Sequence, residues 1–102
     1  MVAEARHTIV VALEVTGEDL YARYRAGMRP ILSEYGGRFD WDLRGGEVLK
    51  SPDGVAVNRV FAISFPNRSK RLSFFEDARY LEVRRTFFEP AVAHAYSIAT
   101  EG

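Results

Sequence analysis

The chain contains no cysteine and only two histidines among its 102 residues. Without cysteine, disulfides, thiolate nucleophiles and cysteine-based metal sites are excluded. The histidines, His7 and His94, are far apart and form neither a His-x-His nor a His-x-x-x-His spacing. We therefore predict a protein with no metal site and no cofactor.

The chain also lacks a long hydrophobic run and an excess of charge of either sign. The apolar run near its start covers only residues 9–13, which is too short for a signal peptide or a membrane span. Its formal net charge at pH 7 is +0, so there is no general electrostatic attraction to nucleic acid or anionic lipid. We expect a cytoplasmic protein with no nucleic-acid partner and no membrane partner.

The composition that is present is that of an ordinary folded chain. Hydrophobic residues make up 47% of the sequence, a proportion typical of globular domains rather than disordered segments. At this length we expect one domain over residues 1–102, with residues 1–6 as a loose tail.

Three segments alternate apolar and polar residues in the manner of β-strands. They are residues 7–15 (HTIVVALEV), 38–44 (RFDWDLR) and 58–65 (NRVFAISF). In each segment the bulkier apolar side chains fall on a single face. These side chains are Ile9, Val11, Leu13, Phe39, Trp41, Leu43, Phe61, Ile63 and Phe65.

Helical spacing appears between the first two strands and again after the third. Leu20, Tyr24, Met28, Ile31 and Tyr35 recur at intervals of three or four, which predicts a helix with one apolar stripe. Its expected N-cap is Thr16, and its expected stop is the Gly36-Gly37 pair. Two shorter helices are predicted over residues 68–76 and 80–88, with Asp77 as the residue that ends the first and caps the second. A last strand is predicted over residues 94–100.

The resulting order, β-α-β-β-α-β, predicts an α+β domain with the ferredoxin-like fold. This fold has a four-stranded antiparallel sheet with both helices on one face. The bulky apolar face of every strand is expected beneath the helices. No part of the chain remains to cover the other face, and a second copy of the protein is the partner expected there.

Four charged residues of the second strand, Arg38, Asp40, Asp42 and Arg44, are expected on this uncovered face. In one interpretation they form a binding site, where Arg38 and Arg44 hold a carboxylate or enolate oxygen and Asp40 or Asp42 acts as a general base. In the other they form salt bridges at the surface or between subunits. The sequence leaves both interpretations open.

Three further residues complete the candidate site. Glu14, between apolar walls near the end of the first strand, is a candidate acid or base, or else a solvated strand end. His94 opens the last strand near the expected pocket mouth, and Tyr96 shares its face. Proton transfer by His94, with Tyr96 contacting a ligand, stands against a purely structural role for both.

Four short segments resemble an uncharacterised domain-of-unknown-function family within the dimeric α/β-barrel superfamily. These segments are residues 35–39 (YGGRF), 44–46 (RGG), Phe65-Pro66 before a short helix, and Tyr80-Leu81 with Arg84. The resemblance implies two chains paired sheet to sheet, with helices outside and a pocket beside the sheet. Relatives in the wider superfamily include small monooxygenases, haem-degrading enzymes, muconolactone-type isomerases and stress-responsive proteins.

RNA-recognition domains share this fold, and residues 59–65 (RVFAISF) faintly match their third-strand motif. Val60 replaces the glycine of that motif, however, and the first strand offers no aromatic partner. We instead expect a homodimer that binds or transforms a small oxygenated or carboxylated organic molecule. The alternative is a non-catalytic dimer whose charged strand serves the subunit interface.

Overall fold

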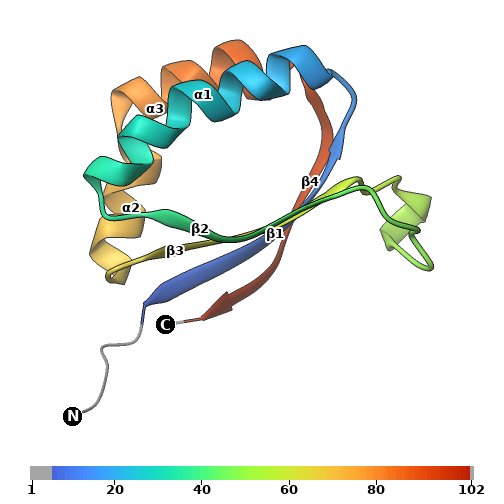
Figure 1. Ribbon diagram of the computed structural model, residues 1–102, viewed down its shortest axis with the longest axis horizontal. Coiled ribbons are helices and arrows are strands. Elements are labelled where there is room, and N and C mark those ends of the chain that lie inside the picture. Colours follow the sequence, from blue (N-terminus) through green and yellow to red (C-terminus); the bar gives the residue numbers. More distant parts are fainter. Residues whose placement is uncertain (1–5, 102) are drawn as a thin grey trace.

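The computed structural model describes residues 6–101 and contains one four-stranded antiparallel sheet with helices on a single face (Figure 1). The strands lie in the order β2-β3-β1-β4, which is the ferredoxin-like arrangement and confirms the predicted fold class. The elements are β1 His7–Val15, α1 Glu18–Glu34, β2 Arg38–Arg44, η1 Pro52–Gly54, β3 Arg59–Phe65, α2 Arg68–Glu76, α3 Ala78–Val83, η2 Arg84–Phe88 and β4 Val92–Glu101.

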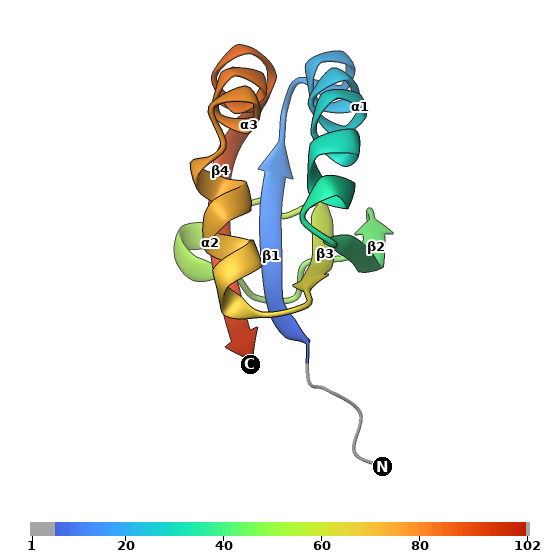
Figure 2. The same ribbon diagram turned by 90° about the vertical axis from the view of Figure 1, so that its left-hand side faces the viewer.

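The central strands β1 and β3 pair in antiparallel register, with Ile9 opposite Ile63 and Val11 opposite Phe61. Their helix-facing side chains join the core, as the alternation predicts. Different helices cover the two sides of this central pair of strands. Viewed from the end, α1 lies over the β3 side of the sheet and α2 and α3 lie over the β4 side, with β1 between them (Figure 2).

Helix α1 presents the predicted apolar stripe, and Tyr24, Met28 and Ile31 are buried. The predicted N-cap is wrong. The helix begins at Glu18, and Gly17 occupies the cap position without a side-chain hydrogen bond. The Thr16 hydroxyl instead donates to the carbonyl oxygen of Ala91 at 3.4 Å, so Thr16 connects the start of the helix to the turn that precedes β4.

The predicted boundary between the two later helices is confirmed at Asp77. Its backbone ends α2, and its carboxylate accepts hydrogen bonds from the amides of Arg79 and Tyr80 at the start of α3. This is ordinary N-capping by an aspartate. The single predicted helix beyond it has a more complex form, because α3 passes into a π-helical segment, η2, over its last turn.

The predicted facing of β2 is wrong beyond Asp40. Phe39 pairs with Ile63, but Trp41 pairs with Ala62, so Asp40 is an extra residue in the ladder. Such a β-bulge reverses the facing of every residue that follows it. Trp41 and Leu43 therefore lie on the uncovered face, 70% and 57% exposed.

The same bulge turns Asp42 and Arg44 toward the helices, opposite Phe61 and Arg59. The four charged residues of β2 are thus divided between the two faces of the sheet. Beyond Arg44 the chain makes a long loop through Gly45 and Gly46, both at positive φ, and this loop extends past the sheet edge (Figure 1).

The predicted loose tail lies outside the described residues except for Arg6. Its Nε donates to the Ser64 hydroxyl at 2.8 Å, and its Nη2 donates to the carbonyl oxygens of Gly36 at 2.7 Å and Ser64 at 2.9 Å. Arg6 therefore holds the start of β1 against the end of β3.

Candidate functional site

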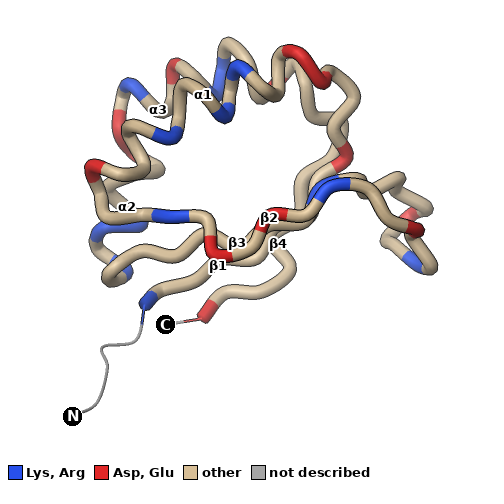
Figure 3. Tube along the Cα trace, viewed as in Figure 1, with Lys and Arg blue, Asp and Glu red and all other residues tan. Residues whose placement is uncertain are grey.

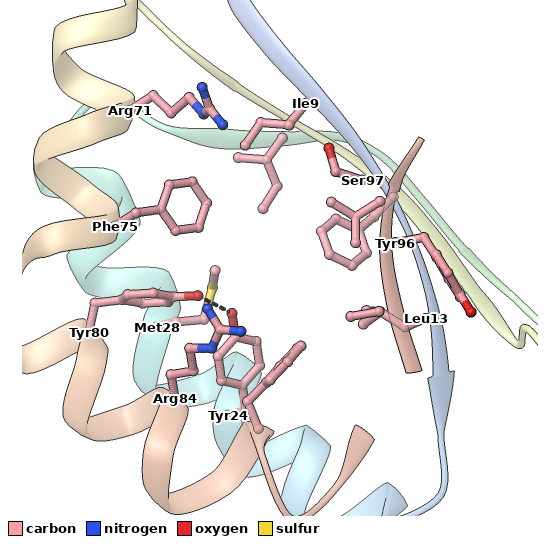
Figure 4. Close-up of a pocket in the computed structure, with 15 residues that line it drawn as sticks. Ile9, Leu13, Tyr24, Met28, Arg71, Phe75, Tyr80, Arg84, Tyr96 and Ser97 are labelled. Atoms are coloured by element: carbon pink, nitrogen blue, oxygen red, sulfur yellow. Dashed lines mark hydrogen bonds between the residues drawn. The ribbon is translucent and has the colours of Figure 1, made fainter. Parts of the chain in front are cut away.

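A cavity of about 270 Å³ lies between the helix-facing side of the sheet and the helices (Figure 4). Its volume is just below the roughly 300–1,000 Å³ of typical small-molecule sites. The lining comes from β1, α1, β3, α2, α3, η2 and β4. It consists of Ile9, Val11, Leu13, Tyr24, Met28, Phe61, Ile63, Arg71, Phe75, Tyr80, Arg84, Phe88, Ala95, Tyr96 and Ser97.

Most of this wall is apolar, and its aromatic rings are held by one another. Phe75 meets Tyr80 edge to face with ring centroids 5.5 Å apart, and Phe88 lies 4.8 Å from Tyr24. Rings packed in this way have few alternative rotamers, so the cavity wall is pre-formed. An apolar ligand body would contact it without a large ordering cost.

Two tyrosine hydroxyls meet at one end of the cavity. The hydroxyls of Tyr24 and Tyr80 are 2.9 Å apart, and both side chains are buried. Burial raises the pKa of Tyr24 well above its usual value, and burial likewise raises the pKa of Tyr80, against the opposing charge of Arg84. Both hydroxyls therefore stay protonated at neutral pH. One proton forms the mutual hydrogen bond and the other is left to donate.

Two arginines also reach this cavity, from α2 and from η2. Arg71 Nη1 lies 3.3 Å from His7 Nε2, and because a guanidinium can only donate, His7 must be the acceptor. The guanidinium of Arg84 lies over the ring of Phe88 at 5.1 Å. Neither arginine has an ion-pair partner among residues 6–101.

The polar groups of the cavity are therefore mainly donors. No Asp or Glu from the described part of the chain lines it, whereas two guanidinium groups do. In a site walled by apolar groups, an unbalanced positive charge attracts an anion more strongly than it would in water. The arrangement suits a ligand that supplies hydrogen-bond acceptors.

Arg38 and Asp40, two of the predicted site residues, lie outside this cavity. Arg38 Nε donates to the Asp40 carboxylate at 2.8 Å on the uncovered face of the sheet. Burial works against ionisation of Asp40, but hydrogen bonds from Ser64 and Arg38 outweigh it and hold the pKa of Asp40 below its usual value. The carboxylate is thus a poor proton acceptor near neutral pH.

Asp42 and Arg44 lie in a second hollow of about 410 Å³, between α1 and the β2–β3 edge. Asp42 accepts two hydrogen bonds of 2.8 Å from Arg25 of α1, which hold the pKa of its carboxyl below its usual value. Arg59 forms a further ion pair with Glu18 at the start of α1. The Arg25–Asp42 and Glu18–Arg59 pairs cross the helix–sheet boundary and connect α1 to the sheet, whereas Arg44 forms no ion pair among residues 6–101.

Glu14 and His94 face each other across β1 and β4, with His94 Nδ1 3.2 Å from a Glu14 carboxylate oxygen. The ring of Tyr96 is parallel to that of His94 at 6.5 Å. All three side chains belong to the uncovered side of the sheet. Of the predicted site residues only Tyr96 is also part of the cavity wall, and its ring points away from the interior (Figure 4).

The model of the family described as a domain of unknown function (DUF1330) matches residues 8–99. The chain belongs to this family. No curated protein matches the sequence. The resemblance inferred from the short segments is confirmed, and two of their residues, Tyr80 and Arg84, lie in the cavity of this DUF1330 domain.

Solved structures show the same fold. A Rhodopseudomonas palustris protein of unknown function superposes with a TM-score of 0.80 at 20% identity, covering 94% of this chain and 81% of the other. A DABB-family protein with a ferredoxin-like fold from Mesorhizobium loti superposes with a TM-score of 0.67 at 15% identity, covering 95% of both chains. These likenesses show that the DUF1330 chain shares the ferredoxin-like fold of these proteins.

The cavity arginine that our sequence interpretation missed was nevertheless detectable. Basic and acidic residues are mixed along the helices, as on a solvated surface (Figure 3). Arg71, however, is four residues before Phe75 in α2, and side chains at that spacing share one helix face. Because Arg71 shares a helix face with the apolar Phe75, the spacing indicates that the Arg71 side chain points toward the sheet.

Proposed function

We propose that this protein binds a small, largely apolar organic molecule bearing oxygen acceptors, in the cavity between the sheet and the helices. One observation carries the proposal: the cavity presents two guanidinium groups and a paired tyrosine hydroxyl, with no carboxylate from residues 6–101 in its wall. A ligand carboxylate, carbonyl or phenolic oxygen supplies the acceptors that these donors lack.

The side chains that line the cavity determine which ligand body fits beside these donors. Its aromatic and aliphatic side chains favour a compact apolar body, and the volume of about 270 Å³ limits the ligand to a small molecule. The tyrosine hydroxyls, kept protonated by burial, are suited to donate to a carbonyl or enolate oxygen. The proposal therefore extends to transformation of such a molecule, in which the tyrosine hydroxyls donate a proton or stabilise the negative charge that develops on the ligand oxygen.

We assign the uncovered sheet face to a second copy of the protein. Trp41 and Leu43 are large and exposed there, beside the half-buried Val10 and Val60. Apolar side chains gathered on one sheet face mark an interaction surface. In this assignment the Arg38–Asp40 and Glu14–His94 pairs lie in or beside the subunit interface, and the non-catalytic interpretation of these charges is preferred.

The ligand proposal is tested by thermal shift and calorimetry with small carboxylates, phenols and neutral amides. Occupancy at about 100 times Kd is expected to add about 2.7 kcal/mol to the free energy of unfolding. The Ala95→Trp variant, which places an indole in the cavity wall, should abolish the response. Ala26→Trp adds the same group on the exposed side of α1 and should leave it intact.

Equal responses from these two variants would show that binding occurs elsewhere on the molecule. A complete absence of binding by the wild-type protein across the panel would contradict the proposal itself.

A further inference from the structure

Arg71 carries a buried donor with no partner. Its Nε is shielded from solvent and makes no hydrogen bond within residues 6–101. Leaving a charged donor unsatisfied away from water is costly, and native structures contain few such groups. Arg71 also lines the cavity, so an acceptor that meets its guanidinium from the cavity would supply the missing partner.

The rest of the guanidinium defines where that acceptor would sit. Nη1 is directed to His7 Nε2 at 3.3 Å. By the covalent geometry of arginine, Nε and Nη2 lie on the other edge of the same plane, with their hydrogens parallel. This edge matches the two oxygens of a carboxylate, which arginine binds through two parallel hydrogen bonds.

The other donors of the cavity are separated from Arg71 along the wall. Phe75 follows Arg71 by one turn of α2 and packs on Tyr80, whose hydroxyl meets that of Tyr24. In Figure 4, Arg71 and the tyrosine pair occupy opposite ends of the cavity, with Phe75 between them. The cavity therefore offers the Arg71 guanidinium at one end, an apolar middle, and the tyrosine hydroxyls as donors at the other end.

From this order we propose that the ligand is an apolar monocarboxylate bound in one orientation. Its carboxylate accepts from Nε and Nη2 of Arg71, its body lies along Phe75, and an oxygen at its far end accepts from the Tyr24–Tyr80 pair. This inference rests on the proposed function and specifies its ligand class. Arg71 is the residue that distinguishes an acid from its neutral analogue.

Arg84 is less suited to hold the carboxylate. It is exposed overall, so water already solvates its charge and an added anion gains less there. Its guanidinium lies over Phe88 beside the tyrosine pair, where its charge opposes the burial-driven rise in the pKa of Tyr80. Arg84 thus reinforces the donor end of the cavity.

The test measures affinity for matched acids and amides by calorimetry: 4-hydroxyphenylacetate, 3-(4-hydroxyphenyl)propanoate and 6-hydroxyhexanoate, each with its primary amide. The wild-type protein should prefer the acids. Arg71→Met should weaken acid binding about 10- to 100-fold, the loss expected for a charge-assisted bidentate contact, and leave amide binding within about threefold. Arg71→Lys should restore only part of the acid preference, because ammonium lacks the planar fork.

Arg68→Met removes an exposed arginine from the first turn of the same helix and serves as the matched control, with no effect on either ligand class. Circular dichroism confirms that each variant is folded. The ligand-free Arg71→Met protein should melt close to the wild type, because the loss of the hydrogen bond to His7 is offset by the removal of an unsatisfied buried donor.

Three results separate the possible failures. Acids and amides that bind the wild type equally well would overturn this inference and leave the proposed function standing. An Arg71→Met protein with unchanged acid affinity and a lowered melting temperature would assign Arg71 a structural role and also overturn it. Binding of neither acids nor amides would defeat the proposed function, and this inference with it.

Discussion

Asp42 of β2 accepts hydrogen bonds from both terminal nitrogens of Arg25 in α1, each 2.8 Å long. The Arg25 guanidinium also lies over the ring of Phe39, 4.1 Å from its centroid. The Asp42 side chain is 40% exposed and that of Arg25 is 12% exposed, so the pair is only partly screened by solvent. This contact connects the first helix directly to the edge of the sheet.

The first prediction concerns the stability of this pair. We expect Arg25→Met to lower the free energy of unfolding by about 1–2 kcal/mol, a value reduced from that of a fully buried charged hydrogen bond because Asp42 is solvated. Urea denaturation measures it. Arg85→Met, which breaks the exposed Glu82–Arg85 pair of the helices, should cost much less, and an equal loss in both variants would contradict the assignment.

The pH dependence of stability provides a second prediction. The pKa of Asp42 is lowered in the folded state, mainly by its hydrogen bonds from Arg25. Such a group stabilises the fold above its unfolded pKa of about 3.9, and the stabilisation disappears as pH falls through the folded pKa. Asp42→Asn should therefore melt below the wild type at pH 7, and the difference should shrink below pH about 4. A constant difference between pH 7 and pH 3 would count against it.

The buried tyrosine pair leads to a third prediction. Tyr24→Phe or Tyr80→Phe alone should cost about 1–2 kcal/mol, because each leaves the other hydroxyl without its partner. The double variant should cost less than the sum of the two, with a coupling energy of about 1 kcal/mol. Strictly additive losses in a double-mutant cycle would show that the two hydroxyls do not depend on one another.

The fourth prediction tests the subunit assignment of the uncovered sheet face. The wild-type protein should have the mass of a dimer in light scattering coupled to size-exclusion chromatography. Trp41→Glu and Leu43→Glu, which place a charge on the apolar face assigned to the interface, should shift it to the monomer.

Leu49→Glu is the matched control for this experiment. Leu49 is 88% exposed but lies on the loop between β2 and β3, beyond the sheet, so the substitution should leave the dimer intact. A monomeric wild type, or an equal effect of all three substitutions, would refute the assignment.

Much of the fold follows from patterns within single segments. The alternation in residues 7–15 and 58–65 predicts β1 and β3 and their helix-facing sides, and Asp77 predicts the break between α2 and α3. These predictions hold because the periodicity of a strand or helix and the chemistry of a capping residue are local. The order of the segments then leaves few topologies, and the family resemblance agrees with the one observed.

The facing of β2 could not be predicted in this way. RFDWDLR alternates without interruption, yet Asp40 is an extra residue relative to its partner strand. A bulge is a property of the pairing between two strands, and one added residue exchanges the faces of all that follow. Trp41 is therefore exposed and Asp42 bound to a helix, the reverse of their predicted positions.

Sequence patterns alone thus determined the elements, their order and the core faces of the central strands, because these depend on neighbouring residues along the chain. The tertiary structure decided which charged side chains meet a cavity. Arg71, Tyr24, Tyr80 and Arg84 converge from α2, α1, α3 and η2 only when the helices pack on the sheet. Such a site depends on distances between segments, and no spacing within one segment encodes them.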